Sequence, residues 1–144
     1  MLTDIHYIDT SYLAPYYLPE ANSDVVESKL LRLPVGSLVI SPLVRSEFAS
    51  LLCRKFRTKE MEAADARRTM IALDKHLGAG VLRMVSVGSS DFERATEWIM
   101  AMKHPLRAPD ALHLAIATRE DAFFWTLDKA LARAAKWVGL KTRK

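Results

Sequence analysis

The chain has 144 residues, half of them hydrophobic, and its 21 basic and 17 acidic side chains give a formal net charge of +4. This length and apolar content predict a single domain over residues 1–144 and exclude a disordered chain. The lone cysteine excludes an internal disulfide and a cysteine-based zinc cluster. No apolar run approaches the roughly 20 residues that span a bilayer, and the first residues lack the layout of a secretory signal, so we expect a cytoplasmic protein with no membrane contact.

Strands and helices alternate along the first half of the chain. The first pattern predicts a short strand that ends near Asp9 and turns into a helix, and a further helix is predicted over Glu20–Leu33. A strand over residues 37–41 follows. Two helices come after it, one from Pro42 to about Arg57 and one over Lys59–Leu77.

The second half continues the alternation. Its pattern predicts a strand over residues 81–87, a helix from Ser90 or Asp91 to about Met102, and a second helix from Pro109. A strand ending near Asp128, a helix to Trp137 and a last short strand in "GLKT" are predicted to follow. Short apolar strands that alternate with helices predict a parallel sheet covered on both faces.

Four acidic residues fall at related places in this pattern. Asp9 and Asp128 end the first and fourth strands, Glu47 lies in the second turn of the helix after the second strand, and Asp110 lies in the first turn of the helix before the fourth strand. Right-handed crossovers bring these positions to one edge of the sheet. Open α/β sheets bind their ligands at this edge.

Each aspartate also has a simpler explanation, because an acid at an N-cap or in a first helical turn stabilises the helix by itself. Glu47 does not fit this explanation, since it lies beyond the first turn and borders an apolar helix face. A carboxylate partly turned toward a core needs a partner, and Arg45 or Arg54 is the competing explanation for Glu47.

Taken together, the acids predict a divalent metal, because carboxylates brought close to one another repel unless a cation intervenes. Oxygen ligands without converging Cys or His favour Mg²⁺ or Mn²⁺, and such ions suit phosphodiester hydrolysis. The hydroxyls of Thr10, Ser11 and Thr126 adjoin the strand ends, where they could orient a carboxylate or simply form turns. His113 is interpreted as a packed or hydrogen-bonded core histidine.

The segments "YIDTSYLAPYY", "VRSEF", "LRAPDALHLAIA" and "FFWTLDKALARAA" resemble, in order, the four acidic motifs of PIN-domain ribonucleases, and in particular of VapC-type toxins of type II toxin–antitoxin modules. The resemblance implies a three-layer α/β/α fold around a parallel sheet of about five strands. It also implies metal-dependent endonucleolytic cleavage of RNA. It maps Asp9, Glu47, Asp110 and Asp128 onto the acidic site, with Asp9 and Asp110 as direct ligands of Mg²⁺ or Mn²⁺.

The same resemblance implies a homodimer that is silenced by an antitoxin protein. We expect Arg45, Arg54 and Lys129 to steer the RNA backbone. One alternative is a non-catalytic PIN-like module that binds RNA or protein. Another is a receiver-like or haloacid-dehalogenase-like domain in which Asp9 accepts a phosphoryl group. Ser11 stands where the D-x-D signature of the dehalogenase group has its second acid.

Overall fold

The computed structural model describes residues 3–144, which form a five-stranded parallel sheet with strand order β3-β2-β1-β4-β5. This confirms the predicted parallel sheet of about five strands. The strands are β1 (His6–Ile8), β2 (Leu38–Ile40), β3 (Arg83–Met84), β4 (Phe123–Trp125) and β5 (Thr142–Arg143).

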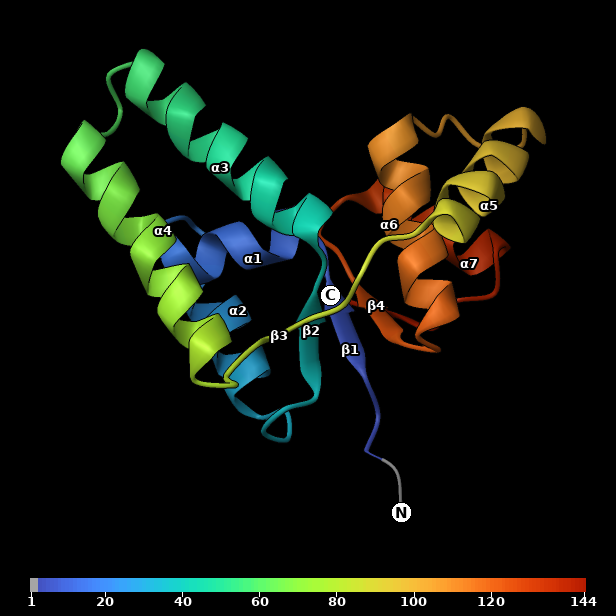
Figure 1. Ribbon diagram of the computed structural model, residues 1–144, viewed down its shortest axis with the longest axis horizontal. Helices are drawn as coiled ribbons and strands as arrows, with labels where there is room; N and C mark the ends of the chain where they lie inside the picture. The colour runs from blue at the N-terminus through green and yellow to red at the C-terminus, as the bar shows by residue number, and fades with distance from the viewer. Residues whose placement is uncertain (1–2) are drawn as a thin grey trace.

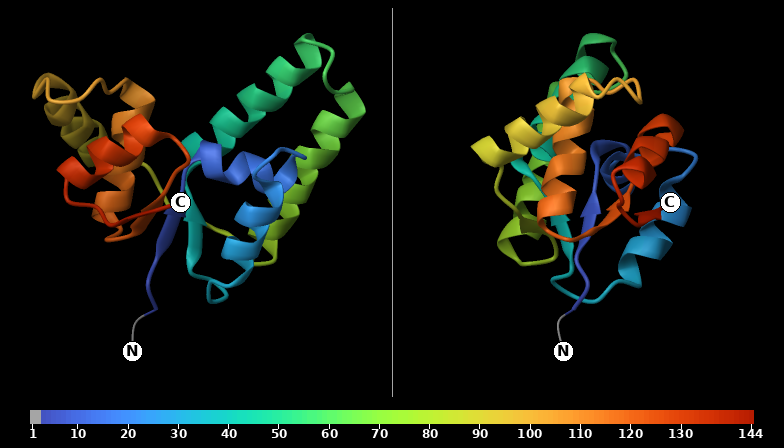
Figure 2. Two further views of the ribbon diagram at one scale, coloured as in Figure 1. Left: turned by 180° about the vertical axis from the view of Figure 1, so that it is seen from behind. Right: turned by 90° about the vertical axis from the view of Figure 1, so that its right-hand side faces the viewer.

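Helices cover both faces of this sheet. Figure 2 shows α1, α2 and α7 on one face and α5 and α6 on the other, while α3 and α4 form an antiparallel pair at the left of Figure 1. The helices are α1 (Thr10–Tyr17), α2 (Ser23–Leu31), α3 (Pro42–Arg57), α4 (Ala63–Gly78), α5 (Ser89–Met100), α6 (Ala108–Arg119) and α7 (Lys129–Trp137). The three-layer α/β/α arrangement is therefore confirmed.

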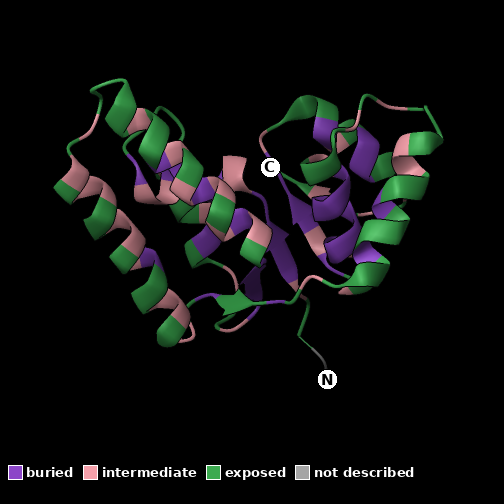
Figure 3. Ribbon diagram, turned by 45° about the horizontal axis from the view of Figure 1, so that its top comes forward, coloured by how far each residue is buried: buried purple, intermediate pink, exposed green. Residues whose placement is uncertain are grey.

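The core is centred on β1, which pairs with strands on both sides and is covered on both faces. Tyr7 and Ile8 are completely buried, as are Val39 of β2 and Phe124 of β4. Residues 111–117 of α6 are all buried as well, and Figure 3 shows buried residues gathered on the strands and on this helix. A strand with neighbours on every side needs a continuous apolar sequence, and "HYI" and "LVI" supply it.

Several predicted elements differ from the structure in their bounds. α2 covers Ser23–Leu31 and not Glu20–Leu33, and the last strand covers Thr142–Arg143 and not residues 139–142. α4 begins at Ala63 and not at Lys59, because α3 ends in a Schellman turn: Lys59 has a positive φ of 62°, and the amide of Glu60 donates to the Lys55 carbonyl at 2.8 Å. The third strand covers two residues and not seven, although the amide of Val85 adds one more bond to Ile40.

All five strands point the same way, so β1, β2 and β4 end at one edge of the sheet. α1, α3 and α7 begin there, directly after these strands. Among residues 3–144, no helix combines the length and apolar character that crossing a membrane requires.

Candidate functional site

Asp9 lies between β1 and α1 and is the most buried of the four predicted acids, with 4% of its surface exposed. As the N-cap of α1 it accepts a bond from the Tyr12 amide at 3.1 Å. The hydroxyls of Ser11 and Thr126 donate to its two oxygens at 2.6 and 2.5 Å. No Lys or Arg pairs with it anywhere in residues 3–144. Burial raises the pKa of Asp9, outweighing the opposing effect of these hydrogen bonds.

Asp128 is connected to Asp9 through Thr126. The backbone amide of Asp128 donates to the Thr126 hydroxyl at 3.1 Å, and that hydroxyl in turn donates to Asp9. Asp128 also caps α7, because its Oδ1 accepts the amides of Ala130 and Leu131 at 2.9 and 3.1 Å. Asp128 is therefore an N-cap and also lies at the same edge of the sheet as Asp9.

Glu47, on α3, is partnered by neither of the arginines considered for it. Its Oε1 accepts a bond from the Thr10 hydroxyl at 2.7 Å and lies 2.5 Å from Nε2 of His113. Burial raises the pKa of Glu47, but the hydrogen bond and charge of His113, followed by Thr10, lower it further, so the net shift is downward. Arg45 instead makes two 2.9 Å bonds to Asp74 of α4.

His113 belongs to a chain of buried hydrogen bonds that the sequence did not predict. An ionised carboxylate only accepts, so Nε2 donates to Glu47, and Nδ1 lies 2.7 Å from the Tyr7 hydroxyl. The same hydroxyl lies 2.8 Å from Oγ of Ser41. The expected hydrogen-bonded core histidine is present, with 3% of its surface exposed. Nothing in its local sequence identifies a partner 66 residues away.

Asp110 is in the first turn of α6, where its Oδ2 accepts the Arg107 amide at 3.2 Å. The Arg107 guanidinium approaches the same oxygen to 3.9 Å but is largely exposed. Asp110 and Asp128 line one hollow together with His104 and Arg107. Asp110 and Asp128 thus face a common space. Asp9 is linked to Asp128 through the hydroxyl of Thr126, and Glu47 accepts a bond from Thr10, the residue that follows Asp9.

The chemistry of these donors suits a hard divalent cation, although they are not gathered into a ready-made cluster. Within residues 3–144, no three His, Cys, Asp or Glu side chains lie close enough together to form a metal-binding group. Yet in the described part of the chain one oxygen each of Glu47, Asp110 and Asp128 accepts no hydrogen bond, and buried Asp9 has no basic partner. Hard oxygen ligands of this kind fit Mg²⁺ or Mn²⁺.

The basic residues expected to steer RNA lie in different surroundings. Arg45 is occupied by Asp74, and Arg54 is exposed two turns beyond Glu47 on α3. Lys129 is the first residue of α7, next to Asp128, and lines a groove with other basic side chains.

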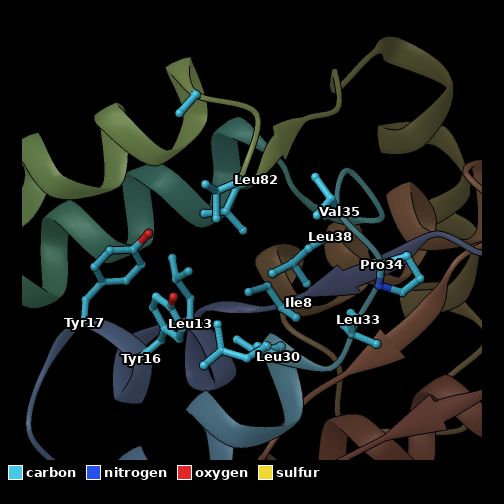
Figure 4. Close-up of a pocket in the computed structure, with 13 residues that line it drawn as sticks. Ile8, Leu13, Tyr16, Tyr17, Leu30, Leu33, Pro34, Val35, Leu38 and Leu82 are labelled. Carbon is cyan, nitrogen blue, oxygen red and sulfur yellow. The ribbon is translucent and has the colours of Figure 1, made fainter.

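An apolar pocket lies away from the acids. Figure 4 shows side chains of α1, the end of α2 and the start of β2 around it, among them Leu13, Tyr17, Leu30 and Leu38. None of the four acids lines this pocket, so it is not the candidate site.

The sequence matches the family model of the PIN domain over residues 6–136. No curated protein matches the chain.

Several solved structures share the fold at low sequence identity. VapC20 of Mycobacterium tuberculosis, described as a sarcin–ricin loop cleaving toxin, is 20% identical with a TM-score of 0.72, over 89% of this chain and 93% of that one. VapBC-1 of nontypeable Haemophilus influenzae is 14% identical with a TM-score of 0.71, over 97% of both chains. A toxin–antitoxin complex of Klebsiella pneumoniae is 19% identical with a TM-score of 0.62, over 88% and 90%.

Proposed function

This chain belongs to the PIN domain family, and on that premise we propose that it is a metal-dependent endoribonuclease and the toxin of a type II toxin–antitoxin module. The observation that carries the proposal is the state of Asp9. A carboxylate that is almost completely buried, fixed by two hydroxyl donors and paired with no basic side chain in residues 3–144 requires either a proton or a cation.

Asp9 and Asp110 would hold Mg²⁺ or Mn²⁺ directly, with Glu47 and Asp128 supporting them. When bound, such an ion lowers the pKa of water and neutralises the charge that develops on the phosphate.

The protein side chains have separate tasks in this proposal. Thr126 and Ser11 fix both oxygens of Asp9. Thr10 and His113 fix Oε1 of Glu47 and leave Oε2 for the site. The second oxygen of Asp128, which no helix amide occupies, takes the proton of the attacking water.

The proposed partners are an antitoxin protein and a second copy of this chain. The antitoxin is supported by the fold shared with a chain of the Klebsiella toxin–antitoxin complex. The homodimer is supported by apolar side chains exposed on the α3–α4 pair, where Phe56 and Ile71 are about half exposed. Light scattering of the purified protein measures the homodimer directly.

The test of the enzymatic proposal is cleavage of a labelled RNA with Mg²⁺ or Mn²⁺, compared with the same reaction in EDTA. We expect cleavage by the wild type in metal, and a loss of at least about 100-fold in Asp9→Asn and in Asp110→Asn. Equal cleavage in EDTA would overturn the metal mechanism. Binding of RNA without cleavage under any of these conditions would identify a non-catalytic module instead.

A further inference from the structure

The net positive charge of this protein resides in its last 16 residues. Residues 129–144 carry six of the 21 basic side chains and no acid, which leaves 15 basic and all 17 acidic side chains in residues 1–128. The rest of the chain is thus slightly negative. Residues 129–144 form α7, β5 and the loop between them, so this segment carries the excess of positive charge.

The structure brings these cations to one groove, which we call the basic groove. It is lined by residues of α7, β5 and the end of β4: Thr126, Leu127, Asp128, Lys129, Ala132, Arg133, Lys136, Thr142, Arg143 and Lys144. Lys129, Arg133 and Lys136 follow one another at spacings of four and three along α7, so they share one face of the helix. At 1.5 Å per residue they extend over about 10 Å.

The other wall of the basic groove is formed by β5, which pairs with β4 and so lies beside the edge where the acids are found. Arg143 is opposite Trp125 in the sheet, and its carbonyl accepts the Thr126 amide at 3.2 Å. The Arg143 guanidinium lies 4.5 Å from the centre of the Phe123 ring, a cation–π contact that orders this side chain. Thr126 and Asp128 line the same groove, so it opens directly onto the acidic site.

The cations of the basic groove are available to a ligand. The ion pairs formed within residues 3–144 engage Arg45, Lys55, Arg68, Arg107 and Arg119, and none involves α7 or β5. Lys129, Arg133, Lys136 and Arg143 are all exposed.

We propose that the basic groove binds the phosphate backbone of single-stranded RNA and leads it to Asp128. The assignment rests on the proposed nuclease function, whose substrate it positions. Phosphates are recognised by exposed cations alone, independently of sequence. A protein partner needs apolar and aromatic anchors, whereas Leu127 and Ala132 are the apolar side chains that line this groove. RNA therefore fits the groove better than an acidic protein segment does.

The test measures binding separately from cleavage. A fluorescently labelled oligouridylate is titrated with protein in EDTA and followed by anisotropy over a range of salt concentrations. Arg133→Gln/Lys136→Gln removes two cations of the basic groove. Arg57→Gln/Arg67→Gln is the matched control, because it removes two exposed arginines from α3 and α4 that form no ion pair in the described chain.

We expect the groove variant to bind about tenfold more weakly and its salt slope to be smaller by about 1.4, since each phosphate contact contributes about 0.7 for a single strand. The control should match the wild type. Equal weakening of both variants would show that overall charge alone governs binding and would overturn the assignment. An oligoglutamate that binds as tightly as the RNA would also overturn it, because the groove would then accept acidic protein.

The outcome is distinguishable from failure of the nuclease proposal. If the groove variant loses binding and the wild type shows no metal-dependent cleavage, the proposed RNA groove is supported and the proposed nuclease activity is wrong. If that variant binds RNA as the wild type does and the wild type cleaves RNA, the nuclease proposal is supported and the proposed RNA groove is wrong.

Discussion

At the scale of single residues, Asp9 has two roles that oppose each other. It caps α1, which stabilises the fold, but its burial raises the pKa of the carboxyl group and makes the ionised form costly. An amide of the same shape keeps the cap, because its oxygen can accept from Ser11 and Tyr12 while its nitrogen donates to Thr126. Asp9 is therefore placed for ligand binding at some expense of stability.

Asp9→Asn should stabilise the metal-free protein while abolishing cleavage. The variant removes the desolvated charge, so its melting temperature in EDTA at neutral pH should rise by a few degrees. Calorimetry measures the change. Asp128→Asn is the control, since Asn caps a helix as well as Asp does at an exposed N-cap. A marked loss of stability in Asp9→Asn would show that the carboxylate is purely structural.

Metal binding should weaken in mildly acidic solution. The pKa of Asp9 is raised in the folded protein, so the carboxyl takes up a proton as the pH falls, earlier than an ordinary aspartate would. A cation has to displace this proton, so Mn²⁺ affinity should drop and binding should release protons. Isothermal titration in buffers of different ionisation enthalpy measures both quantities. Affinity independent of pH, without proton release, would contradict the assignment of Asp9 as a ligand.

At the scale of elements, the buried chain from Ser41 through Tyr7 and His113 to Glu47 ties α6 to β1 and α3. His113→Ala should cost about 3 kcal/mol of unfolding free energy, because it opens a cavity and leaves Tyr7 and Glu47 without a partner. His113→Gln retains polar atoms at the site and should lose less. Urea unfolding compares the two variants. A His113→Ala protein as stable as the wild type would show that these bonds do not hold the elements together.

The sequence predicts the order of the elements and the edge at which the acids lie, because both follow from hydrophobic periodicity and the handedness of crossovers. The sequence also indicates that Glu47 needs a partner, and the structure supplies one. Its actual partner, His113, could not be predicted, because that contact depends on where the fold places α6 relative to α3. The sequence does not indicate the start of α4, because a lysine, and not a glycine, takes the left-handed position after α3.

At the scale of the whole molecule, a group of acidic side chains and a group of basic side chains lie next to each other at one edge of the sheet. The acids lie at the ends of β1 and β4 and the starts of α3 and α6, and the excess positive charge lies on α7 and β5 beside them. A phosphodiester needs cations to attract it and a carboxylate site to react in. Both are contiguous because β5 is the neighbour of β4 in the sheet.

We propose that acids far apart in the sequence share one cation. A crystal structure of the protein grown with Mn²⁺, examined by anomalous scattering, tests this most directly. We predict a manganese peak bound to the carboxylate of Asp9 and to that of Asp110. A peak bound elsewhere, or no peak at millimolar Mn²⁺ with the acids in the positions described, would contradict the account.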